Sequence, residues 1–259
     1  MHFGFWEKDT KNRQEAILNE NKEVIRYGAI RTGMRILDAG CGVGGTAIYI
    51  AQTTGADVWG ISLDPKQIEL AIHYARKRPL TSPLTHFSAQ DYMKTSFPDN
   101  YFDVVYGIES ICYAEPKSSF FREAYRILKP GGKLILLDGY LAIKPKTEKE
   151  RQVVKKFCWA FALPSMVTNE EMMTTMKKEG FIQTHSINKL KEVIPSVKYY
   201  RTWGILTKPF CILSQYIPLQ PIQAIYHNYL ACSTAAEGYL MGIGSYWLQY
   251  GQKPSKNDK

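Results

Sequence analysis

One short run, residues 35–50, limits what this chain can fold into: an apolar segment ending in Asp38 is followed at once by closely spaced glycines. The apolar segment predicts a β-strand, and the residues from Thr46 onward predict a helix. Glycine suits the turn between them because it tolerates positive φ and lacks the Cβ that would hold a ligand away from the backbone. The amides that open the helix would then face that ligand. The run therefore predicts a binding site at the carboxyl end of a first strand.

The spacing of these glycines indicates which of two classes of ligand the turn would bind. The pattern is Asp38-x-Gly40-x-Gly42, and Gly45 lies one residue too early for the Gly-x-Gly-x-x-Gly turn of dinucleotide-binding folds. This difference favours a ligand with an adenosine and a small cationic tail over a pyrophosphate. The pattern resembles the first motif of class I S-adenosylmethionine (AdoMet) methyltransferases. The resemblance implies AdoMet as the cofactor.

The segments that follow support this resemblance. Strands that alternate with helical segments predict βαβ units and a parallel sheet. A helix is expected to begin at Asp64-Pro65, and a Leu-Lys-Pro-Gly-Gly turn is expected at 128–132. Further strands are expected at 57–63, at 84–88, within 97–106 and after that turn. The resemblance implies an α/β fold: a Rossmann-like, mostly parallel seven-stranded sheet flanked by helices, with a helical, aromatic lid inserted between the late strands.

The length of 259 residues suits one α/β domain with an elaboration. We expect a cofactor-covering segment at 1–30, the Rossmann-like AdoMet-binding core at 31–140, the remaining core strands with a substrate lid at 141–254, and a disordered tail at 255–259. The five cysteines are scattered and odd in number, which predicts neither a disulfide framework nor a metal cluster. No signal peptide and no membrane-spanning run is evident, which favours a cytoplasmic setting.

The net charge of +9 raises the question of an acidic partner. Basic side chains gather between Lys144 and Lys156, where Glu148 and Glu150 interrupt them. The run indicates either a solvated helix face or attraction to an anionic membrane surface, so peripheral membrane association is an open expectation. No nucleic-acid module is recognisable, and nucleic acid is not expected as a partner. The sequence leaves the oligomeric state open.

Residues around the glycine turn are assigned to the cofactor by the resemblance. It implies that Gly40 and Gly42 line the methionine part of AdoMet. Asp38 would orient the turn or contact the ammonium group through water, with an ordinary turn aspartate as the alternative. The same resemblance extends the cofactor set to Tyr106, on the expected fourth strand.

The end of the second expected strand departs from the commonest pattern, because Ser62 stands where many relatives have an acid. The Gly-Ile-Ser/Thr-Leu-x-x-x-Gln pattern there is similar to cyclopropane fatty-acid synthases and to tocopherol and sterol methyltransferases. It implies that Ser62 and Gln67 contact the ribose, with Leu63 beside them. Asp64 is the rival for the ribose, unless it serves only as a helix N-cap.

Two other segments complete the expected cofactor site. The resemblance places the Asp91 carboxylate on the adenine amino group, with Gln90 and Tyr92 against the ring; a plain surface turn is the alternative. The segment His2-Phe3-Gly4-Phe5-Trp6 resembles the aromatic segment that folds over AdoMet in lipid-methylating families. Aromatic faces attract a sulfonium cation, so Phe5 and Trp6 are predicted to contact the cofactor. Otherwise the segment only anchors a helix to the core.

The best catalytic candidates follow the fourth expected strand. The segment from Tyr106 to Ala114 resembles the Glu-x-x-Cys-His-Ala segment of sterol methyltransferases, but Tyr113 replaces the histidine. Glu109 would be a base, an electrostatic partner for developing positive charge, or only a loop anchor. Tyr113 and Tyr239 are secondary candidates as hydroxyl donors to the substrate.

The aromatic residues after 140 predict an apolar acceptor pocket under a lid. The leading hypothesis is therefore AdoMet-dependent O- or C-methylation of a hydrophobic small molecule or lipid, such as a fatty acid, a sterol or terpenoid, or a quinone. Cyclopropane-synthase-like methylene transfer is the first alternative, and Tyr113 disfavours it. A catalytically silent AdoMet-binding protein is the second. A nicotinamide oxidoreductase lacks support because the full glycine pattern and an acid at position 62 are missing.

Overall fold

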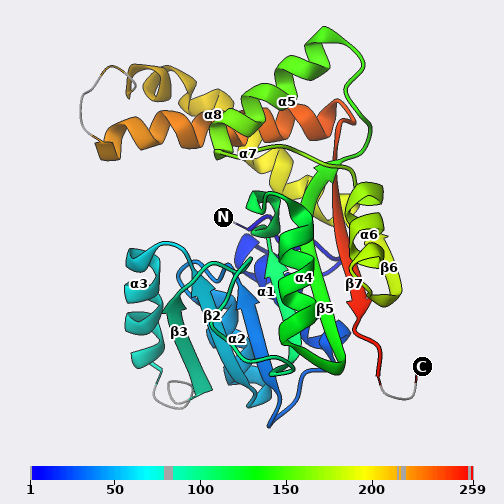
Figure 1. Ribbon diagram of the computed structural model, residues 1–259. Coiled ribbons are helices and arrows are strands. Elements are labelled where there is room, and N and C mark those ends of the chain that lie inside the picture. Colours follow the sequence, from blue (N-terminus) through cyan, green and yellow to red (C-terminus); the bar gives the residue numbers. More distant parts are fainter. Residues whose placement is uncertain (1, 79–83, 215, 217–219, 256–257, 259) are drawn as a thin grey trace.

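The computed structural model describes residues 2–78, 84–214, 216, 220–255 and 258. At its centre lies a seven-stranded sheet in the order β3-β2-β1-β4-β5-β7-β6, in which β7 alone runs antiparallel to its neighbours (Figure 1). The strands are β1 (Arg35–Ala39), β2 (Asp57–Ser62), β3 (Thr85–Ala89), β4 (Phe102–Ile108), β5 (Leu128–Leu141), β6 (Ile182–Asn188) and β7 (Gly244–Gln252). The predicted Rossmann-like, mostly parallel sheet is confirmed.

Alternate residues of the central strands enter two separate cores, as the two-residue period of a strand requires. Ile36 and Val104 face a core shared with α1 and α2, whereas Leu37 and Val105 face a core shared with α4 and α6. Helices thus cover both faces of the sheet. The helices are α1 (Arg13–Gly28), α2 (Gly45–Thr54), α3 (Pro65–Arg76), α4 (Lys117–Ile127), α5 (Glu148–Phe161), α6 (Asn169–Lys178), α7 (Leu190–Ser214) and α8 (Gln220–Leu240).

Local signals explain where several of these helices begin. Asp64 caps α3 by accepting a hydrogen bond from the Lys66 amide, with Pro65 in the first turn. Thr147 and Thr168 each form a capping box with a glutamate three residues later, which starts α5 and α6. The strand–turn–helix prediction for residues 35–50 is also confirmed, since β1 leads directly into the glycine turn and α2.

Three helices, α5, α7 and α8, form a layer beyond the end of the sheet at which β5 finishes (Figure 1). In the chain they lie between β5 and β7, as expected for a lid inserted between late strands. The expected basic run lies at the start of α5, where Lys144 pairs with Glu171 and Arg151 pairs with Glu148. Among the described residues, no helix is both long and apolar enough to cross a membrane.

The prediction for the start of the fifth strand was wrong. The segment at 128–132 was predicted to form a turn before the strand, but β5 already begins at Leu128 and runs through it. Gly131 adopts φ +79°, and its amide donates a hydrogen bond to the Lys253 carbonyl. The pairing with β4 shifts register between Phe102 and Val104, so an irregularity within the strand replaces the turn. Most of the tail that we expected to be disordered, at 256–257 and 259, lies outside the described residues.

Candidate active site

A cleft of about 840 Å³ opens at the carboxyl ends of β1, β2 and β4. Its walls come from the turns that follow β1 and β2, from the loop after β4, and from His2 and the buried side of α1. Small-molecule sites typically occupy about 300–1,000 Å³, and open parallel sheets bind ligands at this edge. The cleft therefore has the size and position of a cofactor site.

The glycines after β1 shape one wall of the cleft. Gly40 has φ +99°, and a Cβ there would lie 2.4 Å from the Ser110 Cβ, so no other residue fits without a shift. Gly42 and Gly45 also line the cleft, and a Cβ built on either meets no atom within 4 Å. The space that their missing side chains leave is therefore part of the cleft. A ligand can lie directly against this backbone.

The turn after β2 contributes a polar pair and an exposed apolar side chain. Ser62 donates a hydrogen bond of 2.8 Å to the Gln67 Oε1, and both residues line the cleft. Leu63 is 70% exposed and also lines it, so its side chain offers an uncovered apolar surface to a flat ring. Asp64 is the N-cap of α3 and does not line the cleft. Of the residues predicted for the ribose, Ser62 and Gln67 thus line the cleft and their rival Asp64 does not.

Only one residue of the predicted adenine segment reaches the cleft. Tyr92 lines it and donates a hydrogen bond to the Ser110 carbonyl. Gln90 is held within its own loop, because its side chain contacts Ser88 and Ser96. Asp91 accepts a hydrogen bond from the Met93 amide, as in a surface turn, and does not line the cleft.

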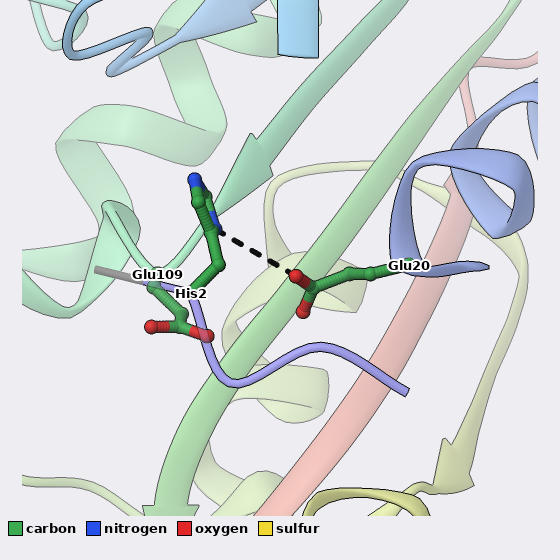
Figure 2. Close-up of side chains that lie close together, drawn as sticks. All are labelled: His2, Glu20 and Glu109. Carbon is green, nitrogen blue, oxygen red and sulfur yellow. Dashed lines mark ion pairs between the residues drawn. The ribbon is translucent and has the colours of Figure 1, made fainter. Parts of the chain in front are cut away.

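Two carboxyls and an imidazole from distant parts of the chain lie close together (Figure 2). His2 lies in the N-terminal segment, Glu20 lies in α1, and Glu109 directly follows β4. One ligand-type atom from each lies within 4.8 Å of the other two, and the His2 Nδ1 is 3.7 Å from the Glu20 Oε2. Both of these atoms are buried and lack a hydrogen-bond partner among the described residues. His2 and Glu109 also line the cleft.

A tyrosine hydroxyl bridges the two carboxyls. The Tyr246 hydroxyl lies 2.7 Å from the Glu20 Oε1 and 3.0 Å from the Glu109 Oε1, which also accepts a hydrogen bond from the Phe3 amide. A hydroxyl donates one proton, so both contacts are satisfied only when one carboxyl carries a proton and donates it back. The set Glu20–Tyr246–Glu109 is therefore built to share a proton.

Burial sets the protonation of this group. It raises the pKa of Glu109 to about 7, and it raises the pKa of Glu20 well above its usual value, with the nearby charge of Glu109 adding to the effect. Burial also lowers the pKa of His2 to about 4, so the imidazole is neutral near pH 7. A carboxylate whose pKa lies near 7 is suited to accept a proton.

Aromatic rings surround the carboxyls on the side of the lid. Phe3 makes edge-to-face contacts with Tyr200, Tyr239 and Tyr246, with ring centroids 5.7–6.1 Å apart. Tyr239 is buried and does not line the cleft; it lines a narrow apolar pocket of about 30 Å³ between β5, α5 and α8. Tyr113, in contrast, is half exposed at the mouth of the cleft. The structure therefore brings Glu109 and Tyr113 to one cleft and leaves Tyr239 behind an aromatic layer.

Four predicted cofactor residues do not line the cleft. Phe5 is fully buried and packs edge-on against Tyr246, and Trp6 donates a hydrogen bond from its indole to the Ser196 hydroxyl. Phe5 and Trp6 thus hold the segment against the rest of the fold, whereas His2 of the same segment lines the cleft. Asp38 and Tyr106 are buried on adjacent strands in register. Burial raises the pKa of Asp38 to about 7.

The sequence-based reasoning missed Glu20 and Tyr246 and did not single out His2 as a site residue. One signal for Glu20 was present, because it lies on the buried face of α1 between Ala16 and Val24, at helical spacing of four. A charged residue on an apolar helix face requires a partner in the fold. Tyr246 carried no such signal.

A family model described as a methyltransferase domain matches residues 37–136. The sterol 24-C-methyltransferase of Pneumocystis carinii is 32% identical over 213 residues, 80% of this chain and 55% of that protein. The erg6 sterol 24-C-methyltransferase of Aspergillus fumigatus is 34% identical over 177 residues, 66% of this chain and 46% of that protein. The chain thus spans about half the length of these curated relatives.

Solved structures share the whole fold. A geranyl diphosphate methyltransferase in complex with SAM matches with a TM-score of 0.75 at 16% identity, over 97% of this chain and 98% of that chain. The (4+2)-cyclase SpnF matches with a TM-score of 0.78 at 22% identity, over 98% of this chain and 87% of that chain. Because one fold supports both, the fold alone does not fix the reaction.

Residues 37–136 match the methyltransferase-domain model, and the sheet order and the position of the cleft agree with that match. Over this part the chain is similar to class I AdoMet-dependent methyltransferases. The two curated relatives reported above are sterol 24-C-methyltransferases, so the chain is similar to members of the sterol and lipid methyltransferase group.

Proposed function

We propose that the protein binds AdoMet in the cleft after β1 and transfers its methyl group to a hydrophobic small molecule or lipid of sterol or terpenoid type. The fit of the cofactor is supported by the open backbone at Gly42 and Gly45. Ser62 and Gln67 hold hydroxyl and amide groups at the position expected for the ribose, and Leu63 and Tyr92 flank the space for the adenine. When bound, AdoMet supplies an electrophilic methyl group and leaves as a neutral thioether.

The observation that carries the proposal is the position of Glu109. Its carboxyl lies in the cleft, is oriented by the Phe3 amide and the Tyr246 hydroxyl, and has its pKa raised to about 7. An acceptor that attacks the methyl carbon gains positive charge and must then lose a proton. Glu109 is placed to offset that charge and to take the proton.

The acceptor class is supported by the surroundings of the carboxyls. The rings of Phe3, Tyr200 and Tyr239 form an apolar cluster beside the carboxyls, and Tyr239 also lines a small apolar pocket of about 30 Å³ under the lid. Aromatic faces stabilise a nearby cation, which favours acceptors that become cationic as the new bond forms. An alkene carbon is such an acceptor, and the curated relatives are sterol C-methyltransferases. Carbon methylation of an isoprenoid alkene is therefore the preferred form of the reaction.

The test is the transfer of label from methyl-tritiated AdoMet in the presence of a lipid extract and, separately, the aqueous extract of the same cells. We expect counts in the lipid phase with the native protein and a large loss with Glu109→Gln. Counts only in the aqueous phase would refute the hydrophobic acceptor. Cofactor binding with no counts in either phase would favour a silent AdoMet-binding protein, and labelled cyclopropane products would favour methylene transfer.

A further inference from the structure

The cluster formed by His2, Glu20 and Glu109 leaves polar atoms without hydrogen-bond partners (Figure 2). Glu20 is fully buried, yet its Oε2 accepts no hydrogen bond from the residues that the structure describes. The His2 Nδ1 points toward this oxygen but lies 3.7 Å away, too far for a hydrogen bond, and it lacks a partner as well. Buried polar atoms without partners are rare and indicate a group that the protein itself does not supply.

The two carboxyls of the cluster also lack a cationic partner. Among the described residues, neither Glu20 nor Glu109 forms an ion pair with a lysine or an arginine. Buried acids are usually paired with a cation or coordinate a metal ion, because an isolated buried charge is costly. The cluster therefore has a place for positive charge.

A metal ion explains this arrangement better than a water molecule does. An ionised carboxylate offers only acceptor atoms, and an imidazole nitrogen that carries no proton is an acceptor too. One water donates two hydrogen bonds, so it cannot satisfy three acceptors at once. A divalent cation takes a lone pair from each of the three, and its charge offsets that of the two carboxylates. The donor set therefore favours a cation.

The distances fit a small ion after a limited movement. One donor atom from each of the three side chains lies within 4.8 Å of the other two. Donors about 2.1 Å from one ion lie roughly 3–4 Å apart, so any pair must close by at most about 2 Å. His2 is half-buried and lines the cleft, which gives its ring room to move. The Tyr246 hydroxyl and the Phe3 amide orient the carboxyls, as hydrogen bonds to metal ligands commonly do.

We propose that His2, Glu20 and Glu109 bind one divalent transition-metal ion, with the His2 Nδ1 and one oxygen of each carboxyl as ligands. Imidazole and carboxylate together suit ions such as Mn²⁺ and Zn²⁺. The ion enters from the cleft, which His2 and Glu109 line. As it binds, the proton that the two carboxyls share is released to solvent.

The ion would share Glu109 with the proposed chemistry. A carboxylate oxygen that coordinates a metal ion has its lone pair occupied and does not take a proton from the acceptor. The ion would therefore inhibit methyl transfer. This consequence rests on the proposed function, whereas the binding of the ion does not.

The test is titration of the untagged, AdoMet-free protein with MnCl₂, followed by the electron paramagnetic resonance signal of free Mn²⁺. Mn²⁺ prefers oxygen ligands to thiolates, so the free cysteines do not compete for it. We expect one equivalent to bind. His2→Gln or Glu20→Gln should weaken binding at least about 100-fold, because loss of even a hydrogen-bond partner of a ligand costs about 10–100-fold. The matched controls His73→Gln and Glu69→Gln, on exposed positions of α3, should bind like the native protein.

Thermal melting and titration with S-adenosylhomocysteine, both without metal, check that the variants are folded. Because His2 is half-buried, His2→Gln keeps the test decisive if Glu20→Gln lowers stability. Absence of binding at millimolar Mn²⁺, equal affinity in the native protein and His2→Gln, or equal loss in the controls would overturn the metal site. Intact S-adenosylhomocysteine binding in those cases would leave the proposed function standing.

Discussion

At the scale of single residues, Glu109 combines features that rarely occur together. Its backbone lies in the left-handed region at φ +49°, where a residue with a Cβ is strained. Its carboxyl is nevertheless fixed by the Phe3 amide and the Tyr246 hydroxyl. Strained residues persist where the surroundings hold them in place, and such residues cluster at functional sites.

The first prediction concerns this carboxyl. Glu109→Gln keeps the size and one acceptor oxygen but removes the base, so the rate of methyl transfer should fall by about 100-fold or more. Because burial raises the pKa of Glu109 to about 7, the native rate should increase with pH and level off above about 7. The Gln variant should show no such rise. An unchanged rate and pH profile in the variant would remove Glu109 from the chemistry.

At the scale of elements, the turn from β2 into α3 holds two sets of candidates for the ribose. These are the pair Ser62 and Gln67, which line the cleft, and Asp64, which caps α3. Ser62→Ala or Gln67→Ala should weaken S-adenosylhomocysteine binding by roughly 10-fold, as expected for the loss of a hydrogen bond in a buried site. Asp64→Ala should instead lower the unfolding free energy by about 1 kcal/mol through the lost N-cap and leave affinity unchanged. Calorimetric titration and thermal melting distinguish these outcomes. The reverse pattern would assign the ribose to Asp64.

The N-terminal segment offers a similar distinction. Trp6→Phe removes the hydrogen bond from the indole to the Ser196 hydroxyl, and it should cost about 1 kcal/mol of stability. Affinity for S-adenosylhomocysteine should stay the same, because the structure places Trp6 away from the cleft. A large loss of affinity at unchanged stability would support the original interpretation, in which Trp6 covers the cofactor.

The elements that the sequence predicts well are those with local causes. The glycine turn and the Asp64 cap act within a few residues, so their patterns are visible in the chain. The hydrogen bonds of Glu20, Tyr246 and Glu109 join α1, β7 and the loop after β4, which lie far apart in the sequence. No local sequence pattern therefore predicts that these three side chains come together. The same reason explains Phe5: its aromatic motif is visible, but the face against which it packs depends on the whole fold.

At the scale of the whole molecule, buried acids make stability depend on pH. Burial raises the pKa of Asp38 from 3.8 to about 7 and that of Asp138 to about 6, and it also raises that of Glu20. These acids keep their protons longer in the folded chain than in the unfolded chain. Stability from this source is therefore full below about pH 4 and is lost as the pH rises toward 7.

A melting series at fixed salt checks this expectation. At about 1.4 kcal/mol per pKa unit, the shift at Asp38 alone corresponds to roughly 4 kcal/mol. The melting temperature should drop by roughly 5–10 °C between pH 5 and pH 7.5. Asp38→Asn cannot ionise and should show a shallower decline. A melting temperature that rises over this range would contradict the protonation assigned to the buried acids.

Calorimetric titration of the native protein, Gly45→Ala and Gly45→Phe with S-adenosylhomocysteine tests most directly whether the cofactor binds in the cleft after β1. Gly45 begins α2, lines the cleft and has open space at its Cβ, so either side chain is accommodated without disturbing the fold. We expect binding by the native protein and Gly45→Ala, and loss of binding by Gly45→Phe at an unchanged melting temperature. Undiminished binding by Gly45→Phe, or none by the native protein, would contradict the placement of the cofactor in this cleft.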